Sequence, residues 1–172
     1  MEPVLGRRVA PTRGLLAMTG SGVIASAAKQ SRDREVPVII IHSLAQAIAA
    51  LRAALKAGRP VVLAGPPGAG SYVGPGWFGA LVAAAREEVP DARFSSLLDC
   101  GNDVGAALAA IRSEIEGVVF TGRGDVARRL TDIAHQHGVR FVTDRPAVLL
   151  DLGDDFFASP EILERRCADL LT

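Results

Sequence analysis

The chain has 172 residues, of which 49% are apolar and 5% aromatic, enough for one domain with a sizeable core. Nineteen basic and nineteen acidic residues cancel in formal charge, so neither a nucleic acid nor an acidic membrane surface is expected as a partner. Two widely separated cysteines and three histidines show no zinc-binding spacing, and we predict neither a metal nor a cofactor.

The first 35 residues differ in composition from the rest of the chain. They carry six basic and three acidic residues, a net charge of +3, and they lack a clear helical or strand period. A secretory signal is one interpretation, but the run Thr19–Gly22 interrupts its apolar stretch. We therefore predict a disordered extension over residues 1–35, a single α/β domain over residues 36–172, and a cytoplasmic location.

The segment Gly14–Ser31 resembles a translated bacterial intergenic repeat, which enters a protein sequence when the start codon is placed too far upstream. This resemblance implies that the segment contributes nothing to the fold. Whether residues 1–35 belong to the mature protein stays open, and folding is expected to begin near Val36.

From Pro37 onward, short apolar runs alternate with helical patterns. Several of the runs lack polar alternation, as expected for strands that are buried on both faces of a parallel sheet. No run reaches the length of about eighteen apolar residues that a membrane span needs. The predicted strands are 38–41, 61–64, 94–98, 118–120 and 140–143.

Capping signals mark the helices between these strands. The first helix starts at a capping box over Ser43–Gln46 and stops at Gly58. Asn102 or Asp103 caps the third helix, and the pair Ser159–Pro160 opens the last one. The predicted helices cover about 44–57, 77–89, 104–115, 126–137 and 160–171.

Five βα units in sequence predict a parallel sheet with right-handed crossovers. We expect a doubly wound sheet of the flavodoxin-like or Rossmann-like kind, with helices on both faces. The alternative is an open half (β/α) barrel, because five units are too few to close a barrel of eight strands.

The glycine-rich run Gly65–Gly76 follows the second predicted strand. Ser71 comes directly after Gly70, where a phosphate-binding P-loop has lysine, and this absence argues against a nucleoside triphosphatase. Backbone N–H groups of Gly68, Gly70 and Ser71 could still bind an anion. The alternative is a long turn, because three prolines reduce the number of N–H donors.

Polar residues follow several strands, at the edge where ligands bind in both architectures. His42, Asp99 and Cys100 are candidate catalytic residues for acid–base or covalent chemistry. Thr121 and Arg123 are candidates for holding phosphate. The strand order 2-1-3-4-5 would place His42 opposite Asp99 and Cys100, and the order 3-2-1-4-5 would place it opposite Thr121 and Arg123. Each residue also has a structural interpretation as a cap, a buried thiol or a solvated loop residue.

Three segments resemble a group of small bacterial α/β proteins without an assigned activity. These segments are Ile41–Leu44, Gly74–Phe78 and Leu98–Gly101, and the likeness extends over residues 38–146. The resemblance implies the α/β fold and carries no function with it.

Three functions therefore stay open. The first is a domain that binds a small anionic or phosphorylated metabolite at the carboxyl edge of the sheet. The second is an enzyme that uses His42 with Asp99 or Cys100. The third is an interaction domain without a ligand, and a homo-oligomer is compatible with all three.

Overall fold

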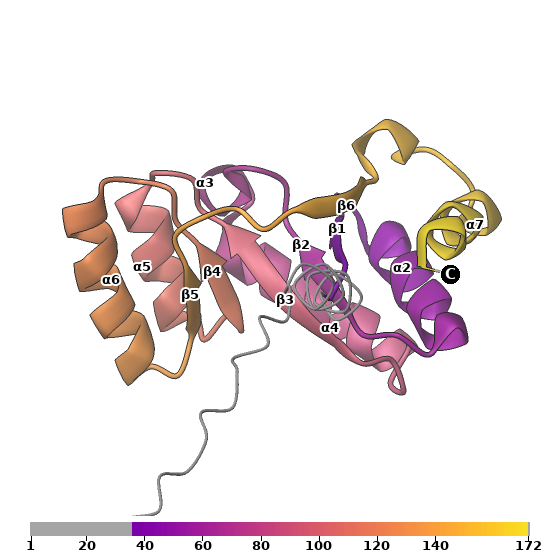
Figure 1. Cartoon of the computed structure of the whole chain (residues 1–172), viewed down its shortest axis with the longest axis horizontal. Coiled ribbons are helices and arrows are strands. Elements are labelled where there is room, and N and C mark those ends of the chain that lie inside the picture. Colours follow the sequence, from indigo (N-terminus) through magenta and orange to yellow (C-terminus); the bar gives the residue numbers. More distant parts are fainter. Residues whose placement is uncertain (1–35, 172) are drawn as a thin grey trace, which may run out of the picture. The chain divides into compact units, whose positions relative to one another are not determined.

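Six parallel strands form one sheet in the computed structural model, which describes residues 36–171 (Figure 1). The expectations for residues 1–35 fall outside this range. The strands lie in the order β5-β4-β3-β2-β1-β6. Their bounds are β1 Val38–Ile40, β2 Val61–Ala64, β3 Phe94–Asp99, β4 Gly117–Val119, β5 Arg140–Val142 and β6 Val148–Asp151.

The helices begin and end close to where the capping residues predict. Ser43 caps the first helix by accepting a hydrogen bond from the N–H of Gln46, and Gly58 ends it at a φ of 64°. Asp103 likewise accepts from the N–H of Ala106. The bounds are α2 Leu44–Ala57, α3 Ala69–Tyr72, α4 Gly74–Glu88, α5 Val104–Arg112, α6 Gly124–Gln136, a 3₁₀ turn η1 over Gly153–Asp155, and α7 Pro160–Leu171.

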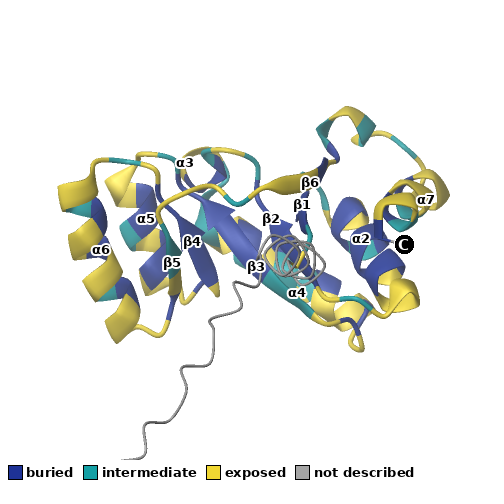
Figure 2. Cartoon of the chain, viewed as in Figure 1, coloured by how far each residue is buried: buried dark blue, intermediate teal, exposed yellow. Residues whose placement is uncertain are grey.

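Alternate residues of the strands face two different environments. Figure 2 shows the central strands mostly buried, whereas β5 and β6 at the edges of the sheet are more exposed. Ile39, Leu63 and Leu98 pack in clusters that also contain buried helical residues. Val38 and Leu97 belong to a third cluster, in which every buried member described is a strand residue. The helices therefore pack against one face of the sheet.

The α/β class with a parallel, unclosed sheet is confirmed. Strands β1 to β5 follow one another as neighbours, so the orders 2-1-3-4-5 and 3-2-1-4-5, and the crevice that each would open beside β1, are not formed. Of the two predicted arrangements, an unbroken strand order with helices on one face is that of the open half barrel. A sixth strand, which the sequence did not predict, extends the sheet beyond β1.

The segment 143–147 joins the two outermost strands and crosses the face that lacks helices (Figure 1). Five strand spacings span about 24 Å in a flat sheet, whereas six residue steps reach at most about 20–22 Å. The sheet must therefore curve to bring its edges together. Arg145 and Pro146 cover a small cavity of about 70 Å³ against Val38, Leu97 and other residues of this face.

Candidate functional site

The carboxyl ends of the six strands meet at one edge of the sheet, as parallel strands must. Most of the candidate residues lie in loops or strand ends at this edge, and Gly70 and Ser71 lie in the short helix α3 that follows β2. They are joined there by two residues that were not candidates, Arg145 after β5 and Asp151 at the end of β6.

Asp99 is the most buried charged residue at this edge, with 7% of its side chain exposed. Its Oδ1 accepts hydrogen bonds from the backbone N–H groups of Gly68 at 2.9 Å and Gly101 at 2.8 Å. Its Oδ2 accepts from Nε of Arg145 at 2.6 Å, and this hydrogen bond raises the pKa of Arg145. Asp99 thus joins three strand-end loops through charge-assisted hydrogen bonds.

The glycine-rich run is more ordered than a long loop, because it contains α3 and the first turn of α4. Gly68 adopts a φ of 74° and donates its N–H to Asp99, while the N–H of Ser71 donates to the carbonyl of Gly68. The hydrogen bond from the N–H of Ala106, followed by one from the Ser71 side chain, lowers the pKa of Asp103, the cap of α5. The donors of Gly68 and Ser71 are therefore used within the protein.

Cys100 lies in the core, directly beneath the glycine-rich run. Only 1% of the residue is exposed, and a Cβ added at Gly70 would come within 2.5 Å of its Sγ. Burial, followed by the charges of Asp99 and Asp103, raises the pKa of Cys100 to about 12. The thiol is therefore protonated at neutral pH, an environment opposite to that of a reactive cysteine.

His42 is held by Asp151 of β6 and Gln46 of α2 rather than by Asp99 or Cys100. Its Nε2 lies 2.8 Å from Oδ1 of Asp151, and its backbone N–H donates to the side chain of Gln46 at 2.7 Å. The Gln46 amide in turn donates to the carbonyl of Leu152 at 2.7 Å. These contacts fix the end of β1 to the end of β6.

A small hollow of about 70 Å³ lies beside His42. Tyr72 and Trp77 contribute to its lining and are 64% and 46% exposed, so both aromatic rings can meet a ligand from solvent. Partial burial, with smaller contributions from the charges of Asp99 and Asp151, raises the pKa of Tyr72. The hollow thus combines an imidazole with two aromatic side chains at the carboxyl edge.

Thr121 and Arg123 lie in the loop that follows β4. The N–H of Thr121 donates to the carbonyl of Gly101 at 2.7 Å, which fixes this loop to the end of β3. Nε and Nη2 of Arg123 donate to the two carboxylate oxygens of Asp125 at 3.1 and 2.9 Å. The Arg123 side chain is 81% exposed at the start of α6.

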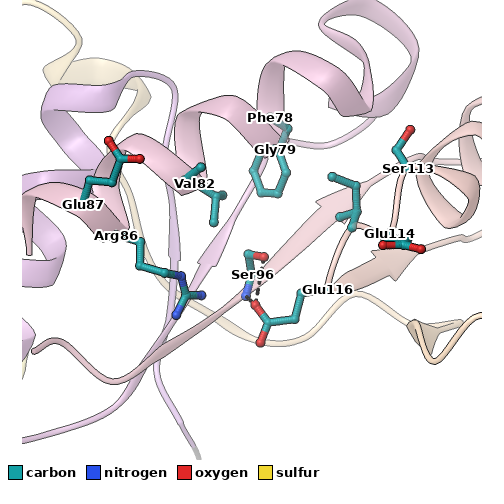
Figure 3. Close-up of a pocket in the computed structure, with 11 residues that line it drawn as sticks. Phe78, Gly79, Val82, Arg86, Glu87, Ser96, Ser113, Glu114 and Glu116 are labelled. Carbon is teal, nitrogen blue, oxygen red and sulfur yellow. Dashed lines mark hydrogen bonds between the residues drawn. The ribbon is translucent and has the colours of Figure 1, made fainter. Parts of the chain in front are cut away.

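A larger groove of about 490 Å³ lies away from these residues, between α4 and the loop before β4 (Figure 3). Gly79 and Arg86 line it from α4, and Ser113 and Glu114 line it from the loop. A Glu116 oxygen accepts from both the N–H and the hydroxyl of Ser96, at 2.9 and 3.1 Å. None of the candidates from the sequence lines this groove.

The described part of the chain contains neither a metal-binding cluster nor a membrane-spanning helix. Within residues 36–171, no three histidine, cysteine or acidic side chains are grouped closely enough to hold a metal ion. Among the helices of this range, none is long and apolar enough to cross a membrane.

One curated protein and one solved structure that resemble parts of this chain are both named as aldolases. No family model matches the chain. The sequence is 30% identical over 118 residues to the plasmid fructose-bisphosphate aldolase of Cupriavidus necator, covering 60% of this chain and 34% of that protein. A solved structure described as a fructose-1,6-bisphosphate aldolase, from Coccidioides immitis, matches with a TM-score of 0.54 and 16% identity, over 70% of this chain and 44% of that one. The structural likeness supports the α/β fold, and the chain spans about a third of the curated relative.

Proposed function

We propose that the carboxyl edge of this sheet binds a small phosphorylated metabolite of the sugar-phosphate class. The observation that carries the proposal is the sequence similarity to an aldolase named for a bisphosphorylated sugar. Parallel α/β folds bind their ligands at the carboxyl ends of the strands. The polar strand-end residues described above lie at this same edge.

In this proposal, Arg123 is the side chain that recognises phosphate. Its planar guanidinium can form two parallel hydrogen bonds to a phosphate group. The present bond to Asp125 is a solvent-exposed ion pair, which contributes little free energy and can be exchanged for a dianion. Arg123 also directly precedes α6, whose first N–H groups favour negative charge.

The glycine-rich run has a different role in the proposal from the one first expected. Because Asp99 already accepts the N–H of Gly68, the run is not a ready anion cradle. Gly68, Gly70 and Ser71 instead line the site, where Gly68 donates to Asp99, Gly70 packs against Cys100 and Ser71 lies beside Asp103. Thr121 holds the Arg123 loop in place through its backbone.

Isothermal titration calorimetry at low ionic strength tests this function. Fructose 1,6-bisphosphate is expected to bind, and unphosphorylated fructose is not. Arg123→Gln should weaken the binding by about tenfold, the equivalent of about 1.4 kcal/mol, because a hydrogen bond to a charged group is lost.

Arg129→Gln is the matched control, since Arg129 is also exposed on α6 but lies more than a turn further from the strand end. The Arg129→Gln variant should bind fructose 1,6-bisphosphate with the affinity of the wild type. Equal losses in both variants would indicate non-specific charge attraction. No heat of binding with the bisphosphate would contradict the function and favour the interaction domain.

A further inference from the structure

The pairing of His42 with Asp151 brings together two residues that are 109 positions apart in the sequence. Asp151 ends β6 and His42 follows β1, and these two strands are neighbours in the sheet. Asp151 Oδ1 also accepts the N–H of Gly153 at 2.9 Å, which orients a carboxylate that is 51% exposed. A carboxylate that holds one nitrogen of an imidazole is the arrangement by which proteins orient a proton-accepting histidine.

This geometry sets which ring nitrogen carries the proton. An ionised carboxylate only accepts hydrogen bonds, so a neutral His42 facing Asp151 has its hydrogen on Nε2. The lone pair then lies on Nδ1, to which no residue in the range 36–171 donates a hydrogen bond. His42 is thus able to accept a proton from outside the protein.

Gly153 preserves the alignment of the pair. A Cβ added there would lie 3.1 Å from Nε2 of His42 and 3.3 Å from Oδ1 of Asp151. These separations are shorter than ordinary van der Waals contact, so any larger residue would press on both partners. Glycine at position 153 therefore leaves the ring and the carboxylate undisturbed.

The hollow beside His42 has the composition of a small ligand site. Tyr72, Trp77 and Phe78 line it together with His42. Sites for small molecules are mostly apolar and aromatic, with a few placed polar groups that orient the ligand. His42 is such a polar group here.

We propose that His42 accepts a proton from a hydroxyl group of the metabolite, and that Asp151 is its positioning residue. The O–H bond breaks, the proton forms a bond to Nδ1, and the electron pair stays on the ligand oxygen. The resulting imidazolium remains beside the Asp151 carboxylate, which offsets its charge. This inference rests on the proposed function for the identity of the ligand as a phosphorylated sugar.

Labelling of histidines with diethyl pyrocarbonate, mapped on the full chain by mass spectrometry, tests the ligand contact. The chain has three histidines, and His135 and His137 lie exposed at the end of α6, where they serve as internal controls. Fructose 1,6-bisphosphate at ten times its Kd should slow labelling of His42 by about tenfold, because about a tenth of the protein stays unbound. Labelling of His135 and His137 should not change.

The second arm tests the proton on the ring. In ¹⁵N NMR spectra the neutral His42 ring should be protonated at Nε2, and Asp151→Asn should lose this preference and bind the bisphosphate more weakly. A thermal unfolding scan of Asp151→Asn confirms that the variant folds. A residue that only joined β1 to β6 would give an unchanged affinity in this variant, and that result would overturn the proposal.

The two hypotheses fail in different ways. If calorimetry detects binding of the bisphosphate but His42 labels at the same rate with and without it, the binding function stands and the role of His42 is overturned. If calorimetry detects no binding, the function itself fails and the inference fails with it.

Discussion

Burial gives the three candidate catalytic residues different chemistry, although each lies at the carboxyl end of a strand. Asp99 is buried and saturated by two backbone N–H groups and Arg145. Cys100 is buried, and the nearby charges of Asp99 and Asp103 further oppose the formation of its thiolate. His42 is partly exposed, with 26% of its side chain accessible, and keeps one ring nitrogen available. Only His42 has the access to solvent that a proton acceptor needs.

The cysteines provide a test at the residue scale. Burial raises the pKa of Cys100 to about 12 and that of Cys167 to about 11, so both thiols stay protonated and shielded near neutral pH. Iodoacetamide at pH 8 should label neither cysteine in the native protein and both in concentrated urea. Mass spectrometry of the digested protein measures the labelling. Rapid native labelling of Cys100 would restore its candidacy as a nucleophile.

The raised pKa values of the two thiols make the stability of the protein depend on pH. The folded-state pKa of each thiol lies above the ordinary value of about 8.5. Each protonated thiol therefore makes its full contribution to the free energy of unfolding when the pH is below about 8.5. It is lost as the pH rises toward the folded-state pKa, because unfolding then releases the thiol proton. The free energy of unfolding should therefore fall above about pH 9.

At the scale of elements, α3 can pack closely against the end of β3 because Gly70 has no side chain. Gly70→Ala should reduce the free energy of unfolding by about 1–3 kcal/mol, because the new Cβ would overpack against Cys100 Sγ at 2.5 Å. Urea denaturation followed by circular dichroism measures the change.

Gly76→Ala is the matched control from the same glycine-rich run. A Cβ at Gly76 meets nothing within 4 Å, and the residue lies in α4 without a positive φ. This variant should be unchanged or stabilised by about 0.5–1 kcal/mol, since alanine favours helix. A similar loss in both variants would contradict the packing explanation.

Local signals in the sequence predicted the elements better than their arrangement. Ser43 and Asp103 act through hydrogen bonds to residues three positions away, so their helix starts are readable from the sequence. Strand β6 was missed because its residues are mostly exposed at the sheet edge and only Leu150 is buried. Asp151 was therefore missed with it, since its partnership with His42 depends on which strand lies beside β1.

At the scale of the whole molecule, the carboxylate of Asp99 joins segments that are distant in the sequence. Asp99 joins the glycine-rich run, the end of β3 and the segment 143–147 that covers the open face of the sheet. Strand order and this crossing segment depend on contacts between distant residues. The sequence pattern could therefore not separate the doubly wound sheet from the half barrel.

Asp99→Ala should reduce the free energy of unfolding by about 2–3 kcal/mol, because two backbone N–H groups and Arg145 lose their acceptor. Amide exchange at Gly68 and Gly101 should also become faster. Urea denaturation and hydrogen exchange measure the two effects.

Asp125→Ala is the control, because it removes an Asp–Arg pair that is exposed rather than buried. This substitution should lower the free energy of unfolding by no more than about 1 kcal/mol. If the two substitutions cost the same, Asp99 does not hold the loops as described.

The place of β6 beside β1 also has a consequence for the order of folding during synthesis. The ladder between these strands closes a chain loop of more than a hundred residues, as the 109-residue separation of His42 and Asp151 shows. Such non-local closures have a high entropic cost and slow the folding of a domain. During synthesis on the ribosome, the edge of β1 that pairs with β6 stays unpaired until β6 has emerged. Such an open edge can pair with a wrong strand of the same or another chain.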